Sequence, residues 1–421
     1  MAICVVMTLV PACAAGGSSA GRRHPQTIEV VAAWTGAEQQ NFQRVINGFE
    51  HQTGVHVIYT SASASVPAAL EARLAAGAPP DVAVLPQPGT LRQYATAGLL
   101  VPLDPATRKI VATNYNQVWQ QLASYGGREY GVWFKAADKS LVWYNIGAFE
   151  KAGVVAPDDV AGLLRISATL KSSGVAPFAL GGANPWTLSD WFSNLYLRVA
   201  GPQRYDLLAD HQIPWTDASV KDTLGLMIQV LAPGYLAGGA PGALHTTFPQ
   251  SVNEVLAVHP AAAMTSEAEF VLGALPANRE AQAGIDFDAF PFPAVGTSGP
   301  GVVVGGDVAV MMRPSNAATE LLRYLATPAA AALWASQGGF ISPNLNLDLA
   351  VYPDELIRAA ARSLLEAGNS LRFGLGDLQP PGFGATASAG LEKDLGDLLI
   401  TGDVNTTASA LEQAATAAYR Q

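Results

Sequence analysis

The sequence has few cysteines, few charged residues and no basic cluster. Its two cysteines, Cys4 and Cys13, lie near the start of the 421 residues, so the rest of the chain holds no disulfide. Charged residues make up 14% of the chain, and no run of lysine or arginine offsets the net charge of -10. Because a phosphate backbone attracts a basic surface, this pattern argues against a nucleic-acid partner.

Metal and cofactor motifs are also missing from the sequence. Its 6 histidines are scattered, without a second histidine four positions on or a cysteine nearby. Zinc sites are typically built from such clusters, so we predict no metal site. The sequence contains neither a Gly-x-x-x-x-Gly-Lys phosphate loop nor a dinucleotide fingerprint. We therefore expect no cofactor.

The apolar run at residues 3–15 is too short to cross a bilayer as a helix. It ends in Leu9-Val10-Pro11-Ala12-Cys13, and a Gly/Ser-rich stretch follows. We interpret residues 1–26 as an export signal with a lipobox and a linker, in which Cys13 becomes the lipidated first residue of the mature protein. The alternative is a buried N-terminal strand. No basic residue precedes Arg22, so either the true start lies upstream or the signal is degenerate.

The composition allows two hydrophobic cores, since 49% of the residues are hydrophobic and a chain of this length favours two domains of about 150–200 residues each. Predicted strands at 27–34, 55–60 and 79–86 alternate with helices, which is typical of an α/β fold with a parallel sheet. Ligands of such sheets bind beyond the carboxyl ends of the strands. We therefore expect one rim to contain Trp34-Thr35-Gly36, Ser61-Ala62-Ser63 and Gln87-Pro88-Gly89.

Residues 130–145 predict one long extended segment with a polar centre. Its ends are aromatic and β-branched, as in strands, whereas Lys135 and Lys139 lie in the softer middle. We interpret the segment as a crossing between two lobes. The alternative is one central strand of a single domain.

A second α/β unit is predicted after residue 145, and the chain then returns to the first lobe. Residues 175–180 and 261–264 predict strands, and residues 301–312 predict a late strand that pairs antiparallel in the first lobe. The tail from residue 353 is predicted to be helical.

Several aromatic residues follow predicted strands or begin helices, where core residues are less frequent. Sugar rings stack on aromatic faces while their hydroxyl groups need acidic and amide partners. Carboxylates at Asp190, Glu267 and Asp307 lie near such positions, so we predict a carbohydrate cleft. The alternative for each residue is ordinary packing or helix capping. The aromatic candidates are Trp34, Trp186, Trp191, Phe340 and Phe383.

The order of several motifs resembles the family 1 extracellular solute-binding proteins of ABC importers. It is most similar to the branch that binds α-glucosides and oligosaccharides, and more distantly to maltose-binding proteins. The resemblance covers nearly all of the chain from Thr27. It is carried by the lipobox, Trp34-Thr35-Gly36-Ala37-Glu38, Pro79-Pro80-Asp81-Val82, the crossing at 130–145, Met264-Thr265-Ser266-Glu267 and Gly305-Gly306-Asp307-Val308-Ala309-Val310-Met311.

The resemblance implies two α/β lobes joined by hinge strands, with a ligand held in the cleft between them. Lobe one would contain residues 27–138 and 291–325, and lobe two residues 139–290 and 326–421. The family's binding positions match Trp34, Thr35, Gly36, Ser61, Ser63, Asp81, Gln87, Lys135, Trp186, Trp191, Glu267, Gly306 and Asp307. Relatives often place a tryptophan on the sugar in a late loop, where this chain has Phe383.

The resemblance also implies that the protein is not an enzyme. It would be a monomer anchored by lipid at the outer face of the plasma membrane, where it passes a carbohydrate to an ABC permease. Two alternatives remain open. One is a binder of a phosphorylated polyol, an amino acid or a polyamine in the same fold, for which Lys135 and Lys139 could pair with an anion. The other is a secreted glycoside hydrolase that uses Glu267 with Asp190 or Asp307.

Overall fold

The computed structural model describes residues 26–62, 65–275, 281–298, 301–384 and 389–420. Cys13, Ser63 and the predicted lipobox lie outside these residues. Within the described chain, none of the helices is both long enough and apolar enough to cross a membrane.

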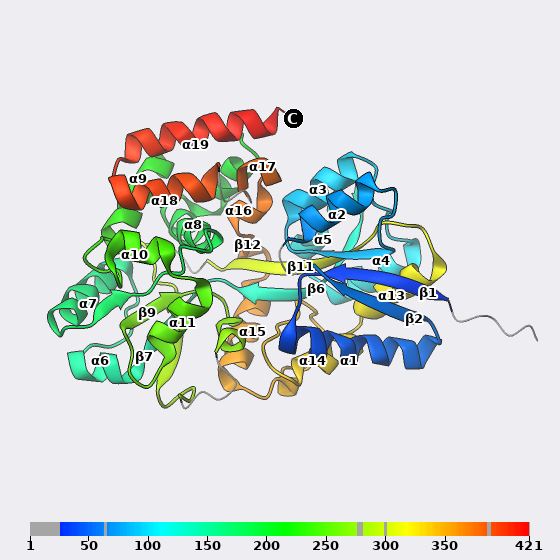
Figure 1. Ribbon diagram of the computed structural model, residues 1–421, viewed down its shortest axis with the longest axis horizontal. Coiled ribbons are helices and arrows are strands. Elements are labelled where there is room, and N and C mark those ends of the chain that lie inside the picture. The colour runs from blue at the N-terminus through cyan, green and yellow to red at the C-terminus, as the bar shows by residue number, and fades with distance from the viewer. Residues whose placement is uncertain (1–25, 63–64, 276–280, 299–300, 385–388, 421) are drawn as a thin grey trace, which may run out of the picture.

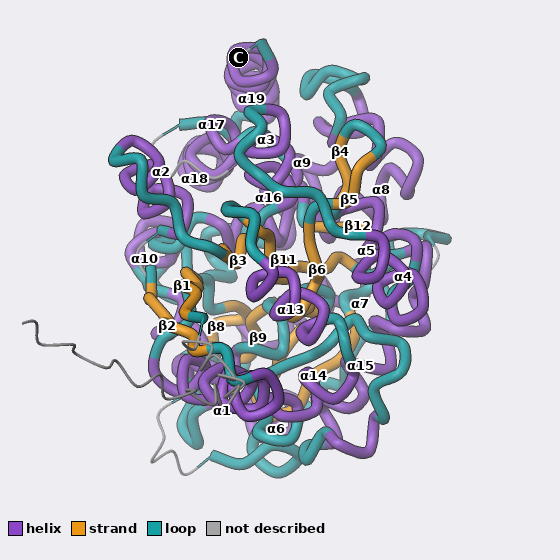
Figure 2. Tube along the Cα trace, turned by 90° about the vertical axis from the view of Figure 1, so that its right-hand side faces the viewer, coloured by secondary structure: helices purple, strands orange, loops and turns teal. Residues whose placement is uncertain are grey.

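The structure has two lobes, each with its own sheet and hydrophobic core (Figure 1). This confirms the predicted two-lobe α/β fold. In the turned view, the strands lie in the interior and helices surround them (Figure 2). The lobe-one sheet has the order β12 (Arg372–Phe373), β11 (Val303–Met311), β3 (Val82–Leu85), β1 (Thr27–Ala32), β2 (His56–Ser61), with β6 (Gly131–Asp138) paired to β11.

Strand directions in lobe one follow the predicted pattern. β1 is parallel to β2 and β3, whereas β11 is antiparallel to β3 and β6. The late strand therefore returns antiparallel into lobe one, as predicted. Its hydrophobic residues Val308 and Val310 are fully buried, which explains why the strand lies inside the sheet.

The helices of lobe one cover this sheet. In the first helix the buried residues Phe42, Val45, Ile46 and Phe49 have the spacing of one helical face. The helix ends at Gly54, whose φ of 73° suits glycine. The lobe-one elements are α1 (Gly36–Thr53), α2 (Val66–Ala75), α3 (Pro88–Thr96), α4 (Pro105–Asn114), α5 (Gln117–Leu122), the hairpin β4 (Ser124–Tyr125) and β5 (Arg128–Glu129), α13 (Asn316–Leu325), α14 (Pro328–Ala335), η1 (Leu349–Val351), α15 (Glu355–Ala367) and η2 (Gly368–Ser370).

Lobe two is built on a smaller sheet with the order β10 (Phe287–Pro291), β7 (Leu141–Asn145), β9 (Ala262–Ser266), β8 (Ala176–Phe178). β7 is antiparallel to both of its neighbours, and β8 is parallel to β9. Its helices are α6 (Ile146–Ala152), α7 (Val160–Ser172), α8 (Trp186–Ala209), α9 (Ala218–Val230), α10 (Gly239–His245), α11 (Phe248–Leu256), α12 (Val271–Ala274), α16 (Leu375–Leu378), α17 (Pro381–Gly384), α18 (Leu391–Thr401) and α19 (Val404–Tyr419).

The segment 326–373 differs from the expected lobe boundary. We expected it in lobe two, but Trp334, Phe340 and Phe373 are buried in the lobe-one core. Trp334 packs 4.8 Å from Trp34, ring centre to ring centre. The sequence pattern shows only that this segment has an apolar face, and either core could have covered it.

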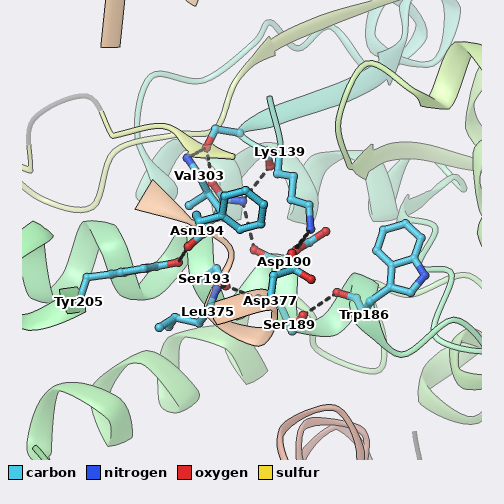
Figure 3. A network of polar contacts seen from close by, with 12 residues as sticks. Lys139, Trp186, Ser189, Asp190, Ser193, Asn194, Tyr205, Val303, Leu375 and Asp377 are labelled. Carbon is cyan, nitrogen blue, oxygen red and sulfur yellow. Dashed lines mark hydrogen bonds and ion pairs between the residues drawn. The ribbon is translucent and has the colours of Figure 1, made fainter. Parts of the chain in front are cut away.

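The described chain passes between the lobes at three places, which are the β6–β7 turn, the β10–β11 connection and the step from β12 to α16. All three are hydrogen-bonded to the helix α8, which is kinked at Gly201. Asn194 donates to the Lys139 carbonyl, and Leu375 N–H donates to Ser193 Oγ (Figure 3). Ser140 donates to Asn194 Oδ1, and Tyr205 donates to the Phe373 carbonyl. Arg198 donates to the carbonyls of Phe292 and Gly301.

Candidate functional site

Lys139, at the turn between β6 and β7, is held between two carboxylates of lobe two. Its Nζ lies 2.8 Å from Asp190 Oδ1 on α8 and 3.0 Å from Asp377 Oδ2 on α16 (Figure 3). Burial alone would lower the pKa of Lys139, but the two carboxylates raise it above its ordinary value. The ammonium group is therefore charged and fully engaged by the protein.

Two glycines leave room for the Lys139 side chain. A Cβ added at Gly305 would lie 2.7 Å from Lys139 Cε, and one added at Gly374 would lie 3.6 Å from Nζ. The first distance is too short for an ordinary contact. The glycines of β11 and of the β12–α16 step thus form the slot through which Lys139 reaches Asp190.

Asp190 and Glu267 are both buried, and Glu267 directly follows β9. Burial raises the pKa of Asp190 to about 6, against the effect of Lys139. Burial and then the charge of Asp190 raise the pKa of Glu267 well above its ordinary value.

We call Lys139, Asp190, Glu267 and Asp377 the lobe-two cluster. A second cluster, the lobe-one cluster, lies on the lobe-one side of the same crossing and contains Lys135, Glu38 and Asp307. Lys135 of β6 forms an ion pair with Glu38 in the first turn of α1, and its register partner in β11 is Asp307. Burial alone would lower the pKa of Lys135, but Glu38 and Asp307 raise it. Burial raises the pKa of Asp307 to about 6, although Lys135 and the Trp34 side chain oppose this shift.

The two clusters act on each other electrostatically across the lobes. Asp377 of lobe two is among the charges that raise the pKa of Asp307 in lobe one. β11 shifts register between Asp307 and Val308, next to Gly306, where an added Cβ would lie 2.6 Å from the Lys135 carbonyl. The structure thus brings together Trp34, Lys135, Asp190, Glu267, Gly306 and Asp307 of the predicted site residues.

Trp186 begins α8 on the edge of this arrangement. Its ring is half-buried and packs 5.2 Å from Phe248 and 5.9 Å from Phe270, centre to centre. Lys139 Nζ lies 6.0 Å from the ring centre. Among the predicted aromatic residues, Trp186 alone combines partial exposure with a position beside the lobe-two cluster.

The other predicted aromatic residues are core residues. Trp191 is 1% exposed and lies between Phe178 and Phe292. Phe340 stacks on Trp334, and Phe383 packs edge-on against Trp215. Trp34 is also buried in the lobe-one core. The expectation that these rings are exposed at a rim is wrong, because each fills a space between helices and a sheet.

Residues after the strands of lobe one lie near the carboxyl ends, as expected. Thr35, Gly36 and Ser61 are exposed at the ends of β1 and β2. Gln87 begins α3 and accepts a hydrogen bond from Thr90 Oγ1.

Asp81 lies at the other end of the sheet. It directly precedes β3, accepts a hydrogen bond from Glu29 N–H at 2.9 Å and pairs with Arg313 at 2.9 Å. Glu29 lies in β1, and Arg313 follows β11, whose end lies beside the start of β3 and away from Gln87. Asp81 therefore links strands and is not brought together with the clusters.

Sequence reasoning missed three members of the clusters as site residues, which are Glu38, Lys139 and Asp377. Glu38 was visible only as part of the motif that follows the first strand. Asp377 lies in the Gly-rich stretch 374–377, but its sequence distance from Lys139 hides the contact. The polar centre of the apolar segment 130–145 was the only sequence feature that pointed to Lys139 as a site residue.

The lobes also touch at Gly89, in the first turn of α3. A Cβ there would lie 2.0 Å from the Gln379 carbonyl oxygen, so the contact requires glycine. Beyond this contact lies a cavity of about 480 Å³ between α3, α5, the end of α8 and residues 369–373. The arginines in its lining are paired, Arg92 with Asp210 and Arg372 with Asp206. We place the candidate site at the clusters, because they contain buried carboxylate oxygens without a donor.

Comparisons with known proteins agree with this architecture. The model of the family described as bacterial extracellular solute-binding protein matches residues 33–332. The chain is 31% identical over 371 residues to the osmoprotective compounds-binding protein GgtB of Synechocystis sp., covering 86% of this chain and 87% of that protein.

Two further comparisons cover most of the chain. It is 31% identical over 379 residues to the alpha-glucosides-binding periplasmic protein AglE of Rhizobium meliloti, covering 86% of this chain and 81% of that protein. The solved structure of the bacterial solute receptor AcbH has a TM-score of 0.81 at 20% identity, over 94% of this chain and 99% of that chain. Two lobes, three crossings and these matches show that the chain belongs to the bacterial extracellular solute-binding proteins.

Proposed function

We propose that this protein binds a neutral carbohydrate between its lobes, outside the cytoplasm, and delivers it to an ABC permease. The ligand would contact Trp186, Asp190 and Glu267 of lobe two and Glu38, Lys135 and Asp307 of lobe one. Thr35, Gly36, Ser61 and Gln87 would extend this contact surface. The two relatives at 31% identity are named for osmoprotective compounds and for α-glucosides, which supports a polyhydroxyl ligand.

The main support for the proposal is that the clusters contain buried carboxylate oxygens that accept no hydrogen bond from the described residues. In the part of the chain that the structure describes, no N–H or hydroxyl group donates to Asp190 Oδ2 or Glu267 Oε2. Buried polar atoms without partners are costly. A sugar carries several hydroxyl groups that can donate to such oxygens once the lobes open to admit it.

The same clusters make an anionic ligand unfavourable. Lys135 and Lys139 are already paired with carboxylates, and the carboxyl groups around them outnumber the two ammonium groups. A phosphorylated ligand would face this surplus of negative charge, and both lysines of the clusters are already paired among the described residues. The anion-binding alternative therefore loses its main support.

A glycoside hydrolase is also disfavoured by geometry. A hydrolase needs two carboxyl groups that are free to act on the sugar bond. Asp190 Oδ1 is instead bound by Lys139 Nζ at 2.8 Å, and both Asp190 and Glu267 are buried. Asp190 is therefore held in an ion pair and is not free to act on a glycosidic bond.

Membrane anchoring belongs to the same proposal. Cys13 would carry the lipid and tether a monomer to the outer face of the plasma membrane. Replacing Cys13 with serine in the full-length chain should move the protein from the membrane fraction to the soluble extracytoplasmic fraction. Unchanged membrane association of C13S would contradict the lipid anchor but not the binding function.

A thermal-shift screen tests the proposed ligand class. We expect glucose, galactose, maltose or raffinose to raise the melting temperature, since a ligand of the folded state at one hundred times its Kd adds about 2.7 kcal/mol. Glycerol 3-phosphate, amino acids and spermidine serve as comparison ligands. A shift with one of these and none with any carbohydrate would contradict the proposal.

A further inference from the structure

The loop that follows β9, residues 267–270, is hydrogen-bonded on both sides of the first crossing, and we call it the site loop. On the lobe-two side, Trp143 Nε1 of β7 donates to the Glu267 carbonyl at 2.9 Å. On the lobe-one side, Glu269 Oε2 accepts the Asp138 N–H at 3.0 Å. Asp138 ends β6, and β7 begins three residues later (Figure 1). The site loop therefore spans the turn at which the chain passes from lobe one to lobe two.

Glu269 is fully buried at this turn. Its carboxyl group is held through Oε2, because Oε1 accepts no hydrogen bond from any residue that the structure describes. Buried polar groups are costly when they lack partners. The Asp138 N–H is thus the contact that fixes the Glu269 side chain, and with it the site loop, to the end of β6.

The site loop also carries residues of the candidate site. Glu267 belongs to the lobe-two cluster, and Phe270 packs 5.9 Å from Trp186, ring centre to ring centre. Under the proposed function, Glu267 and Trp186 both contact the ligand. A ligand that orders these two side chains therefore acts on the site loop directly.

Glu269 faces the lobe-one cluster as well. Burial raises the pKa of Glu269 to about 7, although the Asp138 N–H and Lys135 oppose this shift. Glu269 is in turn one of the charges that raise the pKa of Lys135. A residue of lobe two is therefore bonded to a lobe-one strand and attracts a lobe-one lysine.

We infer that Glu269 is a positioning residue that couples sugar binding at the site loop to closure of the two lobes. The inference rests on the proposed function, since it concerns the same site. Sugar contacts hold the site loop in one position, and the bond from Glu269 to the Asp138 N–H passes this position to β6. Without that bond the sugar still meets lobe two, but its contacts no longer favour one arrangement of the lobes.

The test measures sugar affinity and lobe closure separately. Calorimetry gives the Kd for maltose, galactose and raffinose, and the distance between two spin labels reports closure. Cys4 and Cys13 are the only cysteines, so replacing both with serine leaves the full-length chain free of thiols. Glu71→Cys in α2 and Asp222→Cys in α9 then place one label on each lobe, at exposed positions. We expect bound sugar to bring the wild-type labels to a single distance.

Three variants test the hydrogen bond. Glu269→Met removes the acceptor, so the Kd should rise about tenfold, as for the loss of coupling between two sites. At saturating sugar, E269M should still show a mixture of label distances. Glu269→Gln keeps a carbonyl acceptor and should bind and close as the wild-type protein does. Glu254→Met is the matched control, because Glu254 of α11 also has a buried oxygen without a donor among the described residues but lies outside both clusters.

A second variant covers the case in which E269M does not fold. Glu269→Asp keeps the charge but shortens the side chain by one methylene group, so it should lose the bond and show the same defect in closure. Circular dichroism identifies the folded variants. Loss of folding in both E269M and E269D would assign Glu269 a structural role and overturn the coupling.

The other outcomes separate the coupling from the proposed function. Wild-type affinity and complete closure in E269M would overturn the coupling and leave sugar binding intact. The same holds if E269Q is as defective as E269M, or if the wild-type protein binds sugar without a change in label distance. Absence of binding for all three sugars in the wild-type protein would overturn both ideas.

Discussion

The two sides of the site use the same residue type in different ways. Lys135 and Lys139 lie four positions apart in one crossing segment, and both are buried. Lys135 pairs with Glu38, whose side chain is 41% exposed. Lys139 is held by Asp190 and Asp377, whose side chains are 4% and 20% exposed.

This difference supports the proposal that the lobe-two side of the site is preformed and the lobe-one side is adjustable. Lys139 joins the crossing to α8 and α16, so its two ion pairs link three distant parts of the chain. Glu38, the partner of Lys135, already contacts solvent. Lys135 can therefore exchange Glu38 for a ligand hydroxyl group. A clamp of two lobes needs both features, because a rigid half fixes specificity and an adaptable half allows closure.

Replacing Lys139 should have the largest effect on stability. Lys139→Met leaves Asp190 and Asp377 without their cation, and removing one partner of a buried ion pair costs about 3–5 kcal/mol. Urea denaturation of K139M and wild type measures this loss. Lys171→Met is the control, since no ion pair of Lys171 is found among the described residues. Equal midpoints for K139M and wild type would contradict the preformed lobe-two side.

The two tryptophans of α8 should separate packing from binding. Trp191→Ala removes a fully buried ring and should destabilise the protein by about 3–5 kcal/mol. Trp186→Ala should change the melting temperature much less but abolish most of the thermal shift with carbohydrate. Melting curves with and without sugar measure both effects. A larger loss of sugar response in W191A than in W186A, at equal stability, would reverse these assignments.

Lys135→Met should affect binding more than stability. Because Glu38 is 41% exposed and water can solvate its carboxylate once Lys135 is replaced, the loss of stability should be smaller than the loss of about 3–5 kcal/mol expected for K139M. Loss of a hydrogen bond from a charged group to the ligand should weaken sugar affinity by about tenfold. Calorimetry measures the sugar affinity of K135M, and urea denaturation measures its free energy of unfolding. A stability loss as large as that of K139M would show that the two sides are equally rigid.

The smallest expected effect is the pH dependence due to Asp307. Its pKa of about 6 in the folded state exceeds the ordinary value of 3.8, so the folded protein binds more protons between these values. This contribution to stability is therefore present below pH 4 and lost as pH rises through about 6. From pH 7 to pH 5, the wild-type protein should gain about 1 kcal/mol relative to Asp307→Asn. An unchanged difference between the two proteins at both pH values would place Asp307 in a solvated environment.

Sequence reasoning succeeded where a pattern is local. The helix with Phe42, Val45, Ile46 and Phe49 and the antiparallel return of β11 both follow from the periodicity and type of neighbouring residues. It failed for aromatic residues such as Trp191 and Phe340, because position at a helix start does not tell whether a ring points to solvent or to a core. It also failed for the 326–373 segment, whose apolar face fits either lobe.

The sequence by itself determined the alternation of strands and helices, the crossing at 130–145 and the family resemblance, since each depends on residues close together in the chain. Only the tertiary structure decided that Lys139 meets Asp190 across 51 positions and Asp377 across 238 positions. Such contacts are set by how whole sheets and helices pack. No local pattern encodes the distance between two side chains that belong to different elements.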